Sequence, residues 1–266
     1  MQVVEPKVRL IGETRIREAE IIDYLDEVGG QAWYERVFPD ILDGHTSEGE
    51  ALVEFAARGC YRSFVPGLNP NVTKVREDTE DYFGNILGSG HGSVLEQGWF
   101  VFHFQDVSRV FTHELVRHRV GTAISQESMR YVRLTDIPFW FPEWAKADPE
   151  LIERGTALLE DLERFQVWMA DHFGLDDEGV PFAEKKHKTS FMRRFAPDGV
   201  ATSMTWGCNF RTLRHVIEMR TSPAAEEEIA LVFDQVADVV CKEIPYVMQD
   251  FTYRGDDGWV PENRSV

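Results

Sequence analysis

The sequence predicts an α/β protein, because segments with strand character stand among longer amphipathic helices. Residues 99–105 (WFVFHFQ) alternate aromatic residues with others, which indicates a half-buried strand. Residues 148–174 begin with the Asp148–Pro149 pair and carry apolar residues at helical spacing. The chain has 266 residues, 43% of them hydrophobic, and contains neither a repeat nor a linker. We therefore expect one domain over residues 1–266.

The N-terminal elements follow from short signals. Residues 8–12 (VRLIG) predict a strand, and the apolar spacing after it predicts a helix that stops at Gly29–Gly30. Residues 47–50 (SEGE) have the spacing of a capping box, in which the serine and the glutamate satisfy each other's backbone N–H groups. A second helix is therefore expected to run to about Cys60.

The later elements follow from periodicity. Apolar residues at helical spacing predict a helix over residues 107–117 with Gly121 as its stop, so residues 114–133 should begin on a helix and end in a loop. Residues 209–220 are also expected to be helical. The Ser222–Pro223 pair predicts the start of a further helix with an apolar stripe.

Composition excludes several classes of protein. With 28 basic against 46 acidic residues, the net charge is −18, which argues against binding to nucleic acids or anionic lipid. No apolar run is long enough for a membrane span, and the N-terminus lacks the apolar stretch of an export signal. The three cysteines, Cys60, Cys208 and Cys241, have no metal or disulfide spacing. We expect a cytoplasmic protein.

Basic residues are nevertheless concentrated in residues 114–133 (ELVRHRVGTAISQESMRYVR). This cluster has three interpretations: a solvated helix end, a nucleic-acid patch or a pocket for an anionic ligand. Arg220 favours the pocket, because it falls on the inward stripe of its predicted helix and a buried arginine needs an anion or a polarised carbonyl as its partner. Arg211 and His215, four residues apart, are spaced to grip one ligand.

Two apparent motifs are rejected. Residues 113–118 (HELVRH) place the second histidine five positions after the first, about 140° around a helix, so the two cannot share a zinc ion. Residues 88–93 (GSGHGS) lack the spacing of phosphate-binding loops and predict only a turn. No metal site is expected.

Three separated motifs carry a resemblance to a known family. Residues 117–131 (RHRVGTAISQESMRY) resemble the signature of the flavin-dependent thymidylate synthases, an Arg-His-Arg followed by seven residues and Ser, and then an Arg-Tyr pair. Residues 90–97 (GHGSVLEQ) and 209–220 (NFRTLRHVIEMR) are similar to two further elements of that family. This chain has one extra residue, placed in 120–123 (VGTA), and carries Gly92 and Gln97 where the family usually has Glu and His.

The resemblance implies site residues. The residues implied for FAD are His91, Ser93, Arg117, His118, Arg119, Gln126, Asn209, Phe210, Arg211 and His215. Those implied for dUMP are Glu114, Leu115, Val116, Arg117, Gln126, Ser128, Met129, Arg130, Arg193 and Arg220. Among these, Arg220 is implied to be catalytic, since it matches the arginine that binds and polarises the uracil.

The resemblance also implies a reaction and an assembly. Methylation of dUMP to dTMP would use 5,10-methylenetetrahydrofolate as the one-carbon donor and NADPH as the reductant of FAD. The fold would be a twisted, mostly antiparallel sheet flanked by helices, in a homotetramer with active sites between subunits. Two alternatives remain open: transfer of another one-carbon unit such as hydroxymethyl to a pyrimidine nucleotide, and a non-catalytic nucleotide-binding protein with a degenerate flavin site.

The residues themselves bear on how the pyrimidine is activated. Conventional thymidylate synthases add a cysteine thiolate to the base. Here no cysteine lies beside an obvious activating group, so Cys208 is either a nucleophile or, as we expect, a buried structural thiol. Ser128 has no base beside it in sequence, which favours a nucleotide-binding role over a nucleophilic one.

Overall fold

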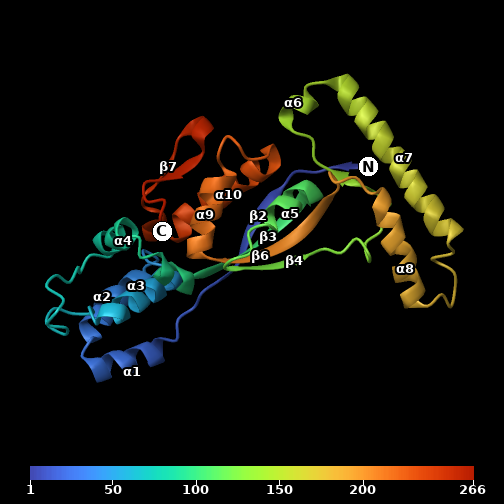
Figure 1. Ribbon diagram of the computed structural model, residues 1–266. Coiled ribbons are helices and arrows are strands. Elements are labelled where there is room, and N and C mark those ends of the chain that lie inside the picture. The colour runs from blue at the N-terminus through green and yellow to red at the C-terminus, as the bar shows by residue number, and fades with distance from the viewer.

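The computed structural model describes residues 1–266 and is built around a four-stranded sheet (Figure 1). In order across the sheet, the strands are β2 (Lys7–Glu13), β3 (Trp99–Ser108), β6 (Ala201–Asn209) and β4 (Thr122–Gln126). Every neighbouring pair is antiparallel. The prediction of an α/β fold with an antiparallel sheet is therefore confirmed.

Helices and short strands complete the chain. The helices are α1 (Glu18–Val28), α2 (Gln31–Leu42), α3 (Glu48–Tyr61), α4 (Thr79–Gly88), η1 (Gly92–Gln97), α5 (Arg109–Leu115), α6 (Glu143–Lys146), α7 (Pro149–His172), α8 (Phe182–Met192), η2 (Arg193–Phe195), α9 (Phe210–Arg220), α10 (Glu227–Glu243), α11 (Pro245–Met248) and η3 (Gly255–Asp257). The short strands are β1 (Gln2–Val3), β5 (Pro138–Phe139), β7 (Phe251–Tyr253) and β8 (Trp259–Pro261). In Figure 1, α1 to α3 lie at one end of the sheet and α6 to α8 at the other. None of the helices combines the length and the apolar character that a membrane crossing requires.

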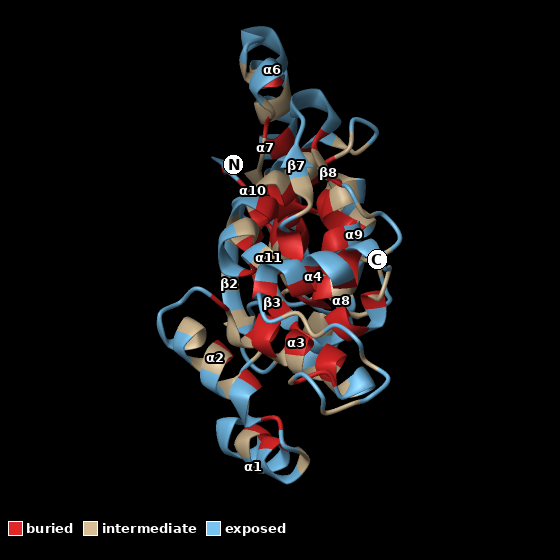
Figure 2. Ribbon diagram, turned by 90° about the vertical axis from the view of Figure 1, so that its left-hand side faces the viewer, coloured by how far each residue is buried: buried red, intermediate tan, exposed pale blue.

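The main core lies between one face of the sheet and the helices α5, α9 and α10. Phe100, Phe102 and Phe104 on β3 and Trp206 on β6 are buried there, which confirms the inward face predicted from alternation. Each side chain of this size contributes about 1.5–3 kcal/mol when fully buried. On the opposite face of β3, His103 is only half-buried. Figure 2 shows the buried residues gathered in this central body, whereas α1 and α6 are mostly exposed.

Several predicted elements are confirmed with their caps. The first helix ends at Gly29, whose φ of 79° is the left-handed conformation that glycine adopts at low cost. Ser47 and Glu50 form the predicted capping box at the start of α3. The Asp148 side chain accepts hydrogen bonds at the start of α7, with Pro149 as the first helical residue. Each of these signals involves residues close together in sequence, which is why the sequence predicts them.

The prediction for residues 107–133 was wrong in two respects. The helix does not begin at Val107, because β3 continues to Ser108, whose hydroxyl accepts the backbone N–H of Phe111 at 3.1 Å and starts α5. The expected loop contains strand β4, which pairs with β6 from Thr122 opposite Cys208 onward. Both differences arise from strand pairing with residues far along the chain.

Other elements also depart from expectation. The last long helix does not begin at Ser222–Pro223, because the Glu226 carboxylate accepts the N–H groups of the first turn and sets the start of α10 at Glu227. Strand β6 and helices α2, α4 and α8 are absent from the predicted elements. For β6 a signal was available, since its buried residues alternate as Met204, Trp206 and Cys208.

A buried ionic network joins the N-terminal helices. The Glu54 carboxylate on α3 accepts hydrogen bonds from Arg58 at 2.8 Å and from Arg36 and Trp33 of α2 at 2.9 and 2.8 Å. The Thr79 hydroxyl of α4 donates to the other carboxylate oxygen at 3.2 Å. Glu54 and Arg58 are both completely buried, so each depends on the other for charge compensation.

We therefore expect Glu54→Ala to lower the free energy of unfolding by about 3–5 kcal/mol, because it leaves the buried Arg58 guanidinium unpaired. Urea unfolding followed by circular dichroism measures this loss. The control is Asp161→Ala, which breaks the exposed Arg164–Asp161 pair on α7 and should change stability by about 1 kcal/mol or less. Equal losses in the two variants would contradict the role assigned to the network.

Candidate active site

A pocket of about 520 Å³ lies where the turn between α5 and β4 meets the start of α9. It is lined by Glu96, Arg117, His118, Arg119, Val120, Asn209, Arg211, Thr212, His215, Arg264, Ser265 and Val266. Hereafter it is called the arginine pocket. Four arginines and a single acidic side chain line it, although the whole chain carries a charge of −18. Its volume falls within the range of small-molecule sites, and its charge suits an anionic ligand.

The end of β6 positions one wall of the arginine pocket. The Asn209 side chain accepts the Thr212 N–H at 2.8 Å and so starts α9 directly at the end of the strand. Because Arg211 and His215 are four residues apart on this helix, both face the pocket, as predicted. Glu96 of η1 binds Arg211 at 2.8 Å and fixes its direction.

The turn before β4 forms the opposite wall. The Asn209 N–H donates to the Gly121 carbonyl at 3.0 Å, and the Thr212 hydroxyl donates to the Val120 carbonyl at 2.9 Å. Gly121 has a φ of +64°, and a Cβ there would lie 2.4 Å from both the Asn209 and Thr212 side chains, so glycine is required. Residues 120–123, which hold the extra residue, thus comprise this turn and the first residues of β4.

Arg220, at the far end of α9, is fixed by three hydrogen bonds. Its Nη1 pairs with the Glu114 carboxylate at 2.5 Å, its Nη2 donates to the Glu114 carbonyl at 3.2 Å and its Nε donates to Nε2 of His118 at 2.9 Å. The Arg220 side chain is only 12% exposed. The prediction that it points inward and needs an anion or a carbonyl as its partner is therefore confirmed, and Glu114 supplies both.

His118 is held as a neutral ring. Burial and the positive charges of Arg220, His215 and Arg117 lower the pKa of His118 to about 4. Since the Arg220 Nε can only donate, Nε2 of His118 must be the acceptor, and the ring proton sits on Nδ1. His118 therefore orients Arg220 without adding a charge.

A second group of predicted residues lies elsewhere. Met129 and Arg193 line a small groove beside α8 that shares no residue with the arginine pocket. The Arg130 carbonyl accepts the Thr189 hydroxyl of α8 at 2.8 Å, while the Arg130 Nε is buried without a hydrogen-bond partner. Ser128 lies in the loop that follows β4. Within one chain, the residues implied for the two ligands are thus only partly brought together.

The remaining predicted site residues lie in different parts of the structure, outside the arginine pocket. His91 lines a separate pocket of about 400 Å³ between α3 and α4, and Ser93 is exposed on η1. Gln126 donates to the Thr112 hydroxyl at 2.9 Å. The side chains of Leu115 and Phe210 are completely buried in the core, so only their backbone atoms can meet a ligand, and Val116 is packed against that core.

Several residues of the arginine pocket were not predicted from the sequence: Glu96, Val120, Thr212, Arg264, Ser265 and Val266. Thr212 could have been found, because it directly follows Arg211 on the predicted helix. No sequence signal connects Arg264 with the motifs, since its approach depends on the path of the chain after β8.

The structure decides between the two interpretations of Cys208. The Cys208 thiol is completely buried in the core, and burial raises its pKa well above the usual value. Burial also raises the pKa of Cys241 to about 11, with the negative charge of Asp238 as a further cause. A thiolate at either position is therefore disfavoured, and the expected structural role of Cys208 is confirmed.

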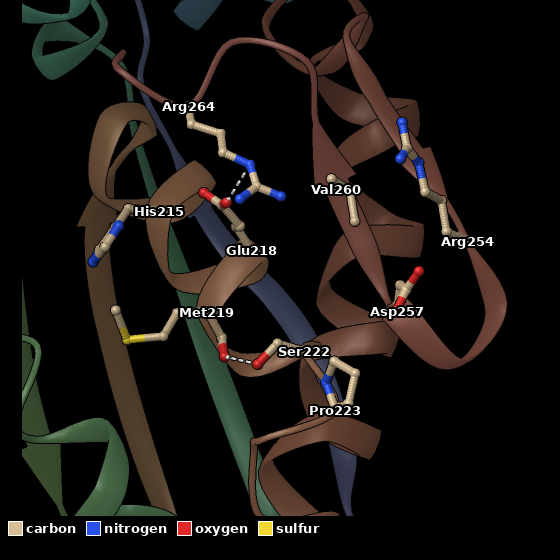
Figure 3. Close-up of a pocket in the computed structure, with 9 residues that line it drawn as sticks. All are labelled: His215, Glu218, Met219, Ser222, Pro223, Arg254, Asp257, Val260 and Arg264. Carbon is tan, nitrogen blue, oxygen red and sulfur yellow. Dashed lines mark hydrogen bonds and ion pairs between the residues drawn. The ribbon is translucent and has the colours of Figure 1, made fainter.

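A second pocket of about 520 Å³ adjoins the first, between α9 and the β7–β8 hairpin (Figure 3). The two pockets share His215 and Arg264. Between them, the Arg264 Nε pairs with the Glu218 carboxylate at 3.2 Å. The Ser222 hydroxyl donates to the Met219 carbonyl at 3.0 Å and closes the end of α9.

Comparisons with known proteins agree with the motifs. The profile of the family described as thymidylate synthase complementing protein matches residues 42–246. The chain is 33% identical over 205 residues to the flavin-dependent thymidylate synthase of Mycolicibacterium gilvum, covering 76% of this chain and 80% of that protein. It is 34% identical over 211 residues to the enzyme of the same name from Mycolicibacterium vanbaalenii, with 76% and 80% covered.

Solved structures show the same fold. A UMP/dUMP methylase from Streptomyces cacaoi, bound with 5-Br UMP, superimposes with a TM-score of 0.60 at 17% identity over 92% of this chain and 93% of that one. Thymidylate synthase X from Helicobacter pylori, with FAD and dUMP, gives a TM-score of 0.52 at 19% identity over 75% and 90%.

The state of His118 can be tested by NMR titration of its ring. We expect the ring to remain neutral as the pH falls to about 4 and Arg220→Ala to raise this pKa, because a neighbouring positive charge is removed while burial remains. His172 on α7 is the control, and its signals should not respond to the substitution. Since the unfolded ring gains its proton near pH 6.5, folding stability should fall as the pH drops from there towards 4. A wild-type ring that protonates in its usual range would contradict this description.

Proposed function

The chain belongs to the family of flavin-dependent thymidylate synthases, and on this premise we propose that it methylates dUMP to dTMP. The one-carbon donor is 5,10-methylenetetrahydrofolate, and NADPH is the reductant of bound FAD. Curated relatives of this name at 30–34% identity support the proposal. The observation that carries it is the fixed position of Arg220, which is bound by Glu114 and His118. Arg220 is the last residue of α9, and the start of this helix lines the arginine pocket.

The residues of the arginine pocket fit the diphosphate of FAD. Arg117, Arg119 and Arg211 offer forked donors, and charge-assisted hydrogen bonds of this kind contribute about 1.5–3 kcal/mol each when shielded from water. His118, Asn209 and His215 lie on the same walls, and we assign them to the cofactor with the backbone of Phe210. His91, Ser93 and Gln126 complete the proposed set. Bound flavin supplies hydride transfer, which no side chain of the chain can provide.

Arg220 is assigned to the pyrimidine. An arginine has five N–H donors, and three hydrogen bonds to Glu114 and His118 leave two for a uracil carbonyl. Donors fixed in advance stabilise negative charge on that oxygen without reorganisation at the moment of reaction. Because His118 is neutral, the positive charge that faces the carbonyl belongs to Arg220. The raised pKa values of the buried Cys208 and the half-buried Cys241 make these two thiols unsuited to the alternative route through a thiolate.

We assign the nucleotide phosphate and sugar to a second group of residues. This group consists of Ser128, Met129, Arg130 and Arg193, together with Gln126 and residues 114–117. The buried Arg130 Nε without a partner supports an anion at this position. Ser128 accepts the Arg130 N–H at 3.4 Å and has no basic side chain bound to its hydroxyl, which supports a binding role.

We further propose a homotetramer in which these two groups meet across subunit boundaries. The separation of the Arg130–Arg193 group from the arginine pocket within one chain supports this arrangement. Each subunit would be a single domain over residues 1–266 with a continuous central core. The three free thiols suit a reducing compartment, and we place the enzyme in the cytoplasm.

A second candidate substrate is UMP. The structural neighbour from Streptomyces cacaoi is described as a UMP/dUMP methylase, and the turn at residues 120–123 differs in length from the family signature. Transfer of a hydroxymethyl unit is tested by the same assay through the mass of the nucleotide product. A protein that binds nucleotide and gives no product would instead be the non-catalytic alternative.

The decisive measurement combines the visible spectrum of the purified protein with release of tritium from C5-labelled dUMP in the presence of both co-substrates. We expect flavin absorbance and tritium release in the wild type. Arg220→Ala should lower turnover by at least about 100-fold while FAD stays bound, because fixed transition-state donors typically contribute about 10²–10³. The control is Arg154→Ala on the exposed face of α7, which should leave activity intact. Absence of both flavin and tritium release in the wild type would refute the proposed reaction.

Ser128→Ala distinguishes a binding role from a nucleophilic one. We expect a KM for dUMP raised by roughly 5- to 10-fold, as for loss of one hydrogen bond, and a kcat that is largely retained. Steady-state kinetics at saturating dUMP separates the two constants. Complete loss of kcat under those conditions would instead make Ser128 a nucleophile.

A further inference from the structure

The segment after β8 is fixed against the middle of α9 by a buried ion pair. Arg214 of α9 binds the Asp250 carboxylate at 2.7 Å, and both side chains are almost fully buried. The same carboxylate accepts the backbone and side-chain N–H groups of Asn263, each at 3.0 Å. The Glu262 N–H donates to the Asp250 carbonyl at 3.0 Å. Arg264 therefore follows directly on an anchored residue.

This anchored path brings the next residues into the arginine pocket. Arg264, Ser265 and Val266 are part of its lining. They pack closely on the other walls, since a Cβ at Gly92 would lie 2.7 Å from the Val266 carbonyl carbon and 2.9 Å from the Arg211 Nε. The family profile ends at residue 246, so this wall lies outside the segment that the profile matches.

The guanidinium of Arg264 retains most of its donors. Its one ionic partner is Glu218, which its Nε meets at 3.2 Å, and no hydrogen bond engages its two terminal nitrogens (Figure 3). The Arg264 side chain is 68% exposed at the boundary of the two adjoining pockets. Glu96 and Glu218 compensate only two of the four arginines gathered here, so an anion that joins them is electrostatically favoured.

We infer that Arg264 is a further ligand for the phosphate groups of the flavin cofactor, held in position by Glu218 and by the Asp250–Asn263 anchor. The inference rests on the proposed function, because the anion it assigns to the arginine pocket is the diphosphate of FAD. Glu96 and Glu218 offset two of the four arginine charges, and the charge that remains matches the two negative charges of the diphosphate, while the forked donors suit its many acceptor oxygens.

The test measures the dissociation constant of FAD for the reconstituted protein of residues 1–266 by quenching of flavin fluorescence. Arg264→Ala should weaken binding roughly 10-fold or more, the effect of losing one charge-assisted interaction. Arg264→Lys should fall between that variant and the wild type, because charge is kept and the fork is lost. Melting temperatures should remain unchanged, since the side chain is largely exposed.

Two further variants separate the possible outcomes. Arg254→Ala removes an arginine of the same C-terminal segment that lines only the adjoining pocket, and it should bind FAD as the wild type does. Arg117→Ala should weaken binding and so reports on the arginine pocket independently. Unchanged affinity in Arg264→Ala beside a weakened Arg117→Ala overturns the inference and leaves the proposed function intact. Tighter binding in Arg264→Ala also overturns it, because the segment would then obstruct the cofactor. A wild type without affinity for FAD refutes both.

Discussion

The antiparallel pairing of β6 with β3 on one side and β4 on the other fixes the positions of the elements that form the candidate site. β6 ends at Asn209, whose side chain starts α9 and whose backbone binds the turn at Gly121. The turn at Val120 and the start of α9, about ninety residues apart in sequence, are thereby joined at one point. The ladder hydrogen bonds between β4 and β6 set the register that brings them together. The arginine pocket exists because these two ends coincide.

Electrostatics of the site depends on carboxylates that fix individual arginines. Glu114, Glu96 and Glu218 orient Arg220, Arg211 and Arg264 respectively, each through one or two atoms of the guanidinium. The remaining N–H groups stay available to a ligand, so each acidic residue both limits repulsion among the arginines and sets their direction. The net charge of the chain is −18, so the attraction of the arginine pocket for an anion is a local effect at physiological salt.

Arg220 and Arg264 illustrate different degrees of constraint. Arg220 is nearly buried and held at three points, which suits a group that must meet developing charge without moving. Arg264 is exposed and held at one point, which suits a ligand for a flexible diphosphate. His118 is neutral for a related reason, because a second positive charge beside Arg220 would be unfavourable in a half-buried position.

Features that depend on neighbours along the chain could be predicted from the amino-acid order: the capping box at Ser47, the Asp148 start of α7, the inward face of β3 and the inward direction of Arg220. The sequence motifs also identified the family and most of the basic residues of the arginine pocket. Tertiary structure alone decided the pairing of β4 with β6, the choice of Glu114 as the partner of Arg220 and the approach of Arg264. Each of these contacts joins residues far apart in sequence, and local periodicity carries no information about which distant segments will meet.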